Sequence, residues 1–162
     1  MDIRPARKAD LPAILTVLEA ARGIMRASGN PNQWPDGYPT TEMILGDIGP
    51  GYGQVLVEEG TVVGYFACIP GPDPTYSYIE NGAWLDDTLP YYVVHRIASL
   101  PSAHGVFRAL LSYCETLTRN IRIDTHADNT IMQGLLKRHG FSYCGVIYLM
   151  NGSPRLAYQR IQ

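Results

Sequence analysis

Hydrophobic residues recur at helical spacing in four segments of the chain. The first helix follows Asp10, which is placed to cap it, and its apolar face consists of Leu11, Ile14, Leu18, Ala21 and Met25. Three more helices are predicted over about 41–48, 105–117 and 128–139, where apolar residues again return every three or four positions. Gly49-Pro50-Gly51 is expected to end the helix over 41–48.

Alternating apolar and β-branched residues predict strands between the helices. The predicted strands cover residues 3–6, 54–58, 62–69, 91–99, 121–126, 142–149 and 155–159, and residues 76–80 are expected to be extended. Glu59-Gly60 and Asn151-Gly152 predict tight turns, so each joins its flanking strands into a hairpin. The strand over 91–99, the helix after it and the strand over 121–126 form a β-α-β unit.

Two proline-rich segments interrupt this pattern. Residues 29–39 contain Asn-Pro, Trp-Pro and Tyr-Pro pairs, which exclude a regular helix, and residues 70–74 form a second break. We find no internal repeat, linker or low-complexity segment. A chain of 162 residues is about the size of one ordinary domain, so we expect a single domain over 1–162.

Composition and charge narrow the classes of partner. The chain has 46% hydrophobic and 17% charged residues, as compact globular proteins do. A net charge of −2 without runs of Lys or Arg argues against nucleic acid and membrane surfaces as partners. The first residues lack the apolar core of a secretory signal, and no stretch is long enough to span a membrane. We therefore expect a cytoplasmic protein.

The three cysteines are expected to be reduced core residues. Cys68, Cys114 and Cys144 lie far apart in apolar surroundings and form no CxxC pair. A catalytic thiol is the alternative interpretation, but no diagnostic sequence context accompanies any of the three.

The turn between the strand over 91–99 and the helix after it could bind an anion. A short loop there brings backbone N–H groups to a helix N-terminus, where free donors and the helix dipole stabilise negative charge, so a pyrophosphate would fit. The loop Leu100-Pro101-Ser102-Ala103-His104-Gly105 has a single glycine, and many ordinary strand-to-helix turns look similar.

The order of several motifs resembles the GNAT acetyltransferase superfamily over nearly the whole chain. The similar segments are Ile3-Arg4-Pro5-Ala6 with Asp10-Leu11, Val62-Val63-Gly64-Tyr65, His95-Arg96-Ile97-Ala98-Ser99, Gly105-Val106-Phe107-Arg108-Ala109-Leu110-Leu111, and Asn129 followed by Lys137-Arg138-His139-Gly140-Phe141. The resemblance implies an α/β (α+β) fold with a mixed, largely antiparallel central sheet of about six or seven strands and about four flanking helices.

The same resemblance implies a site for acetyl-coenzyme A. Ile97 and Ser99 would offer backbone groups to the pantetheine arm, the loop and helix start would wrap the pyrophosphate, and Asn129 would lie beside the arm. The implied cofactor residues are Ile97, Ala98, Ser99, Ser102, Ala103, His104, Gly105, Val106, Phe107 and Asn129. No metal is implied.

Two positions depart from the family pattern. Phe107 stands where a small residue is usual, in a loop shorter than the family's, and Leu136 stands where many of these enzymes carry the Tyr that protonates the leaving thiolate. Tyr92, Tyr143 and Tyr148 are the candidates to replace that Tyr. Together the departures leave open a second function, a catalytically weak acyl-CoA-binding or regulatory domain.

His95 is the leading candidate for a general base, because it matches a strand His that is the base in arylalkylamine acetyltransferases. An imidazole can take a proton from an ammonium near neutral pH. The alternative is a buried structural His. Arg122, Asp124 and His126 share one face of the next strand by the period-two rule. Asp124 and His126 either orient His95 through a hydrogen-bonded network or tie down loops, and a metal site with His95 is a third alternative.

Trp34 and Tyr38 in the first proline-rich loop complete the candidate site. Their rings could form a wall that attracts a cationic acceptor, or they could build a small core under the loop. The sequence as a whole predicts an N-acetyltransferase that moves an acetyl group from acetyl-CoA to a primary amine of a small molecule in a ternary complex. Whether the chain forms a homodimer stays open.

Overall fold

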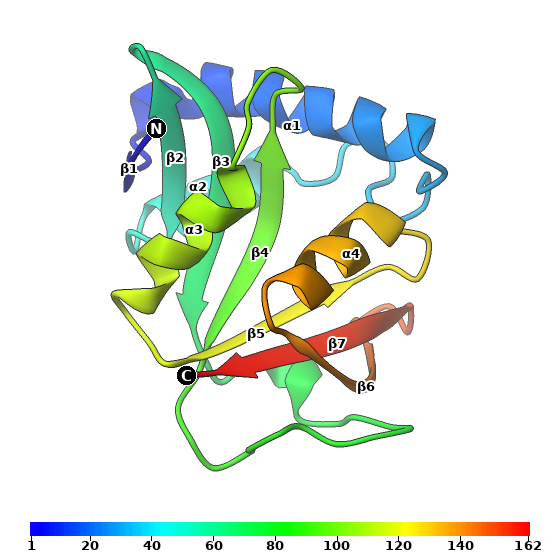
Figure 1. Ribbon diagram of the computed structural model, residues 1–162. Coiled ribbons are helices and arrows are strands. Elements are labelled where there is room, and N and C mark those ends of the chain that lie inside the picture. The colour runs from blue at the N-terminus through cyan, green and yellow to red at the C-terminus, as the bar shows by residue number, and fades with distance from the viewer.

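The computed structural model describes residues 1–162 and is built around one seven-stranded sheet (Figure 1). The strands are β1 (Asp2–Pro5), β2 (Gly53–Glu58), β3 (Thr61–Pro70), β4 (Tyr92–Ser99), β5 (Asn120–Thr125), β6 (Ser142–Tyr148) and β7 (Pro154–Ile161). Their order across the sheet is β1-β2-β3-β4-β5-β7-β6. All neighbouring pairs are antiparallel except β4 and β5, which are parallel. The predicted mixed, largely antiparallel sheet is confirmed.

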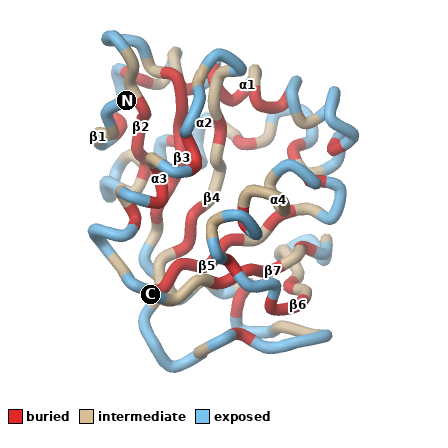
Figure 2. The backbone as a smooth tube through the Cα atoms, in the orientation of Figure 1, coloured by how far each residue is buried: buried red, intermediate tan, exposed pale blue.

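Four α-helices cover the two faces of the sheet. They are α1 (Leu11–Ala27), α2 (Thr41–Ile48), α3 (Val106–Glu115) and α4 (Thr130–Arg138), and short 3-10 turns cover Lys8–Asp10 and Pro74–Tyr76. Since side chains alternate along a strand, Val55 packs with α1 and α2 while its neighbour Leu56 packs with α3 and α4. Figure 2 shows the resulting buried residues running along the central strands.

The segment between β3 and β4 covers the part of the sheet that the helices leave open. Tyr76 and Trp84 in this segment form a third buried cluster with side chains of β4, β6 and β7. This cluster contains Val93, whereas the next residue, Val94, packs with α3 and α4. The segment therefore lies on the sheet face opposite α3 and α4.

Most predicted elements match the structure to within a residue or two, and one strand prediction is wrong. Residues 76–80 form no strand, because the chain makes a 3-10 turn at Pro74–Tyr76 and then only an isolated bridge from Glu80 to Val146. The three cysteines are buried and unbridged, as expected. No helix is both long and apolar enough to cross a membrane.

Asp10 does not have the predicted role of capping α1 with its side chain. Its carboxylate accepts two hydrogen bonds of 2.8 Å from the Arg4 guanidinium and one of 2.8 Å from the Arg7 backbone N–H. These contacts tie β1 to the start of α1. The hydrogen bonds from Arg4 outweigh the effect of burial and lower the pKa of Asp10 to about 2.

Asp10 should therefore contribute to acid sensitivity. Its pKa is lower in the folded chain than in the unfolded chain, so its stabilisation is complete above pH ~4 and is lost as the pH falls toward ~2. We expect Asp10→Asn to lower the free energy of unfolding by about 2 kcal/mol at pH 7 and by almost nothing near pH 2. Urea denaturation at several pH values measures this, and an unchanged difference at low pH would contradict the assignment.

Candidate active site

β4 and β5 separate soon after they begin to pair. The two parallel strands are in register only at Tyr92 with Ile121 and at Val93 with Arg122. Beyond Val93 the two strands diverge (Figure 1), so this edge of β4 has no strand partner. An unpaired strand edge presents backbone donors and acceptors to whatever lies beside it.

A β-bulge occurs in β4 beyond this point. Tyr65 of β3 faces Ala98 and Ala67 faces His95, so Arg96 and Ile97 together face the single residue Phe66. Arg96 has φ of 56°, which is unfavourable for a residue with a side chain and costs about 1–3 kcal/mol. The bulge breaks the alternation of side chains at the middle of the strand.

The side chain of Arg96 holds this bulge in place. Its Nε and Nη2 donate to the two carboxylate oxygens of Asp47 in α2, at 2.8 and 2.6 Å. Asp47 also accepts a hydrogen bond of 2.7 Å from the hydroxyl of Tyr65 in β3. Burial and the Asp47 charge raise the pKa of Tyr65, so this hydroxyl remains a donor. One buried carboxylate thus joins α2, β3 and β4.

An apolar cavity of about 160 Å³ lies at the end of β4, between α1 and the starts of α3 and α4. Of the predicted cofactor residues, it is lined by Ile97, Ala98, Ser99, Val106, Phe107 and Asn129, while Ser102, Ala103, His104 and Gly105 form the adjoining turn. No side chain caps α3. Its first backbone N–H groups are therefore free to bind an anion.

Two residues shape this turn. Gly105 has φ of 73°, in the left-handed region, and a Cβ at this position would meet nothing within 4 Å, so the space in front of α3 is open. The Phe107 ring packs against His139 and Phe141, with ring centroids 5.0 and 6.4 Å away. The bulky residue therefore belongs to the core beneath the turn and leaves the open space free.

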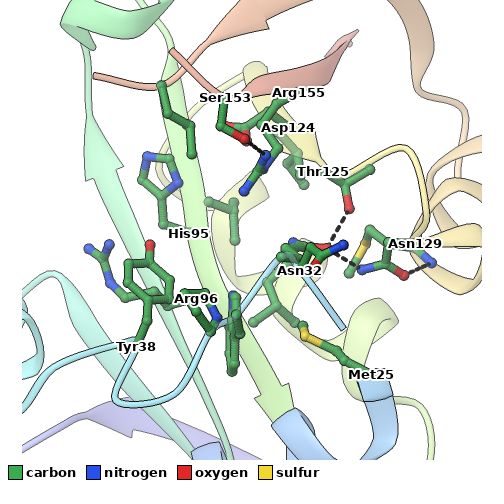
Figure 3. A pocket seen from close by; sticks show the side chains of 18 of the residues that line it. Met25, Asn32, Tyr38, His95, Arg96, Asp124, Thr125, Asn129, Ser153 and Arg155 are labelled. Carbon is green, nitrogen blue, oxygen red and sulfur yellow. Dashed lines mark hydrogen bonds between the residues drawn. The ribbon is translucent and has the colours of Figure 1, made fainter. Parts of the chain in front are cut away.

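A second cavity, of about 250 Å³, adjoins the first, and both are lined by Met25, Ile97, Asn129 and Met132 (Figure 3). Its walls come from β4, the end of β5, the loop after α1 and the start of β7. The predicted site residues that line this cavity are Trp34, Tyr38, His95, Ile97, Asp124 and Asn129. His126 lines neither cavity; its Nδ1 accepts from the backbone N–H of Asp128 at 3.0 Å.

His95 is held by a carboxylate that the sequence analysis did not identify. Its Nε2 lies 3.1 Å from Oδ2 of Asp73, in the segment between β3 and β4. Burial alone would raise the pKa of Asp73, but hydrogen bonds from His95 and Thr75 outweigh it and lower the pKa to about 2. A negative charge therefore stands behind the imidazole at neutral pH.

Asp124 lies near His95 but does not contact it. The Tyr76 hydroxyl donates to Oδ2 of Asp124 at 2.6 Å, and the Tyr76 ring lies 6.5 Å from the His95 ring. Burial, with the Asp124 charge, raises the pKa of Tyr76, so the phenol keeps its proton. Tyr76 thus stands between the two predicted residues. No group of three or more His, Cys, Asp and Glu side chains is arranged to hold a metal ion.

Arg122 lies on the same face of β5 as Asp124, but the contacts of its guanidinium are all with the segment between β3 and β4. Its guanidinium is stacked between the rings of Trp84 and Tyr91, 3.9 Å from each centroid. Its Nη2 donates to the backbone carbonyl of Asp86 and to the Asp87 carboxylate. Arg122 therefore anchors the segment between β3 and β4 and does not reach the cavity.

The loop after α1 is fastened to the cavity wall by polar contacts. Gln33 Oε1 accepts from Asn129 Nδ2 at 2.9 Å, while Asn129 Oδ1 caps α4 by accepting from the Met132 backbone N–H. Arg22 of α1 donates to the backbone carbonyl of Tyr38. Asn129 therefore joins the loop after α1 to the start of α4, and it lines both cavities.

Trp34 and Tyr38 both build a small core under the loop and form part of the cavity wall, the two alternatives that the sequence left open. Trp34 is buried in the core under α1 and α2, and Tyr38 packs edge-on against it with a centroid distance of 6.3 Å. Both rings also line the second cavity. In Figure 3 the hydroxyl end of Tyr38 points into that cavity.

The candidates for a thiolate proton donor lie elsewhere. Leu136 is fully buried in the core, and Tyr92, Tyr143 and Tyr148 line neither cavity. Tyr148 donates to Glu80, and Tyr143 packs against Tyr158. Tyr38 is the tyrosine whose side chain lines the second cavity.

Sequence reasoning missed Asp73, Tyr76 and the residues at the start of β7. Asp73 lies in the proline-rich break, 22 positions before the strand residue His95 that it contacts. The Asp73-Pro74-Thr75 sequence was a usable signal, because Asp before Pro at a turn often accepts local backbone hydrogen bonds. Which distant side chain Asp73 would meet could not be found from spacing.

A crystal structure of a GNAT-family acetyltransferase from Streptococcus agalactiae 2603 shares this fold. The two chains are 35% identical, the match covers 99% of this chain and 95% of that one, and the TM-score is 0.89. This chain belongs to the GNAT family.

More distant solved structures share the GNAT fold. One is the GphF GNAT-like decarboxylase in complex with isobutyryl-CoA, at 16% identity, 99% coverage of each chain and a TM-score of 0.70. Another is the ribosomal-protein-alanine N-acetyltransferase from Brucella melitensis, at 21% identity, 100% coverage of each chain and a TM-score of 0.62. No protein-family model and no curated protein matches this chain.

The carboxylate of Asp47 should be essential to the stability of the bulge. Asp47→Asn would leave the partly buried Arg96 charge without its counter-charge, so we expect the free energy of unfolding to fall by about 3 kcal/mol. Tyr65→Phe removes only a hydroxyl from the same group and should cost about 1 kcal/mol. Urea denaturation compares the two variants. Equal losses would mean that Arg96 does not depend on the charge of Asp47.

Proposed function

We propose that this GNAT chain is an N-acetyltransferase that moves an acetyl group from acetyl-CoA to a primary amine of a small molecule. The observation that carries the proposal is the position of His95. It lines the larger cavity beside the bulge of β4, and a charged carboxylate lies behind its ring. The apolar cavity and the uncapped start of α3 lie further along the same strand.

Coenzyme A fits the residues around the end of β4. The unpaired edge of β4 at Ile97 and Ser99 offers backbone groups to an amide-containing arm, as an additional strand would. The free N–H groups at Val106 and Phe107 suit a pyrophosphate, and the open space at Gly105 leaves room for it. When bound, acetyl-CoA supplies the acetyl group as a thioester. The binding of isobutyryl-CoA by the GphF GNAT-like decarboxylase supports the assignment.

His95 is the proposed general base. With its proton on Nε2, the ring donates to Asp73 and keeps a lone pair on Nδ1. Nδ1 can then take a proton from the acceptor ammonium, directly or through one water. Asp73 remains an anion at neutral pH, so it orients the ring and stabilises the imidazolium that forms. Asp124 would act at a distance, through the Tyr76 hydroxyl.

The size of the larger cavity favours a small acceptor. Its volume of about 250 Å³ lies just below the range of about 300–1,000 Å³ that is usual for small-molecule sites. The rings of Trp34 and Tyr38 in its wall suit the methylene groups and the ammonium of an alkylamine. The direct reaction in a ternary complex needs both cavities filled together.

The second candidate function is a catalytically weak acyl-CoA-binding domain, which the buried Leu136 favours because it cannot donate a proton. A thiolate with a solution pKa near ~8.5 can leave without full protonation, so this position does not prevent transfer. Isothermal titration with acetyl-CoA and a turnover assay across a panel of amines separate the two. Binding without turnover supports the binding domain, and neither binding nor turnover contradicts both functions.

Replacing His95 should affect chemistry more than cofactor binding. We expect His95→Gln to lower kcat about 100-fold while the Kd for acetyl-CoA changes by no more than a few fold. The wild-type rate should rise with pH as the imidazole loses its proton, and the variant should lose that limb. Rate measurements across pH test both statements. Full turnover with only a lower melting temperature would make His95 a structural residue.

A negative charge in the turn before α3 should weaken cofactor binding. His104 is exposed and adjoins Gly105, so His104→Glu adds a carboxylate there without disturbing the left-handed backbone at Gly105. We expect the Kd for coenzyme A to rise about five- to tenfold through repulsion of the phosphates. His104→Gln is the matched neutral control. If both variants bind alike, the phosphates lie elsewhere.

A further inference from the structure

Arg155 at the start of β7 is a buried cation that faces the larger cavity. Its exposed fraction is 7%, and the residue lines this cavity but not the one at the end of β4. By strand register Asp124 is opposite Ala157, and Arg155 has the same parity as Ala157, so Arg155 and Asp124 share one face of the sheet. Figure 3 shows the Arg155 side chain reaching into the cavity beside Ser153.

The guanidinium of Arg155 is only partly satisfied. Its Nη1 donates to Ser153 Oγ at 2.7 Å and to the Pro154 carbonyl at 2.8 Å. Nε and Nη2 have no hydrogen-bond partner, and no carboxylate oxygen lies within 4.0 Å. Both atoms retain some accessible surface, since neither is among the fully buried polar atoms without partners, and Arg155 lines the cavity. Two donors in a fork thus remain available to a ligand.

The other two buried arginines, Arg22 and Arg122, differ from Arg155 because each contacts a carboxylate. Arg22 pairs with Glu19, and Arg122 pairs with Asp87 and is stacked between two aromatic rings. A buried charge that no carboxylate contacts is expensive, so one that lies in a cavity wall is suited to an anion that arrives with the ligand. Burial lowers the pKa of Arg155 and outweighs the opposing effect of the Asp124 charge, which makes no direct contact with the guanidinium.

The remaining charges indicate where such an anion would lie. Asp124 lines the same cavity, and Asp73 stands behind His95. Asp124 lies close enough to act on the charge of Arg155 without contacting it, whereas Asp73 contacts His95. The cavity therefore has a carboxylate directly behind His95 and, at Arg155, a cation that no carboxylate contacts. An acceptor with an ammonium at the first position and an anion at the second would complement both. A planar guanidinium fork matches a carboxylate in two parallel hydrogen bonds.

We propose that the acceptor amine also carries a carboxylate, as amino acids do, and that Arg155 binds this carboxylate through Nε and Nη2. The inference rests on the proposed acetyl transfer and names its substrate class. Ser153 holds the guanidinium in place through Nη1. The contact fixes the distance between the amine and His95, so Arg155 determines which amines react.

The test compares L-amino acids with their α-amides, which keep the amine and lose the carboxylate. We expect the wild-type chain to prefer the acids, and Arg155→Met to raise KM for the acids at least tenfold while changing kcat and the amides little. Arg155→Lys should recover part of the loss, because it restores the charge without the fork. Arg138→Met, on the exposed end of α4, is the control for net charge. Equal use of acids and amides, or equal losses for both in Arg155→Met, would overturn the proposal.

Direct binding separates this inference from the proposed function. Isothermal titration of the wild type and Arg155→Met with the N-acetyl derivatives of the same amino acids needs no turnover. Tighter binding to the wild type, without acetylation of any amine, would support the carboxylate site and contradict the acetyltransferase. If the derivatives bind both proteins equally or neither, the carboxylate site is wrong, even if simple amines are acetylated.

Discussion

The separation of β4 from β5 is the constraint on which both cavities depend. A parallel pair would ordinarily remain bonded along its length, yet these two strands part after Val93. The bulge at Arg96 follows that point and costs strain, which a buried ion pair with Asp47 offsets. α2 therefore influences the site through a single carboxylate, while Ile44 of the same helix packs in the core with α1.

The two cavities differ because different elements wall them. The smaller one adjoins the starts of α3 and α4, so it has apolar side chains and free backbone N–H groups. The larger one lies against the loop after α1 and the start of β7, and His95, Asp124 and Arg155 line it. Such a division suits a long cofactor held by backbone groups and an acceptor held by side chains.

The segment between β3 and β4 organises the charges near the larger cavity. It contributes Asp73 to His95 and Tyr76 to Asp124, and its aromatic rings enclose Arg122. Each of these contacts joins residues that are more than twenty positions apart in the chain. Arg155 is the buried cation that receives no such partner from within the molecule.

The sequence by itself determined the order and extent of nearly all helices and strands, because hydrophobic periodicity and turn residues are local signals. It also indicated the family, the turn before α3 and the candidate base His95.

Tertiary structure decided which groups meet: Asp73 with His95, Tyr76 with Asp124, and an unpaired Arg155 in the cavity. It also decided that Asp10 binds Arg4 and that His126 lies outside both cavities. The reason is physical: pairing across a sheet depends on strand order and bulges, and neither leaves a periodic trace in the sequence.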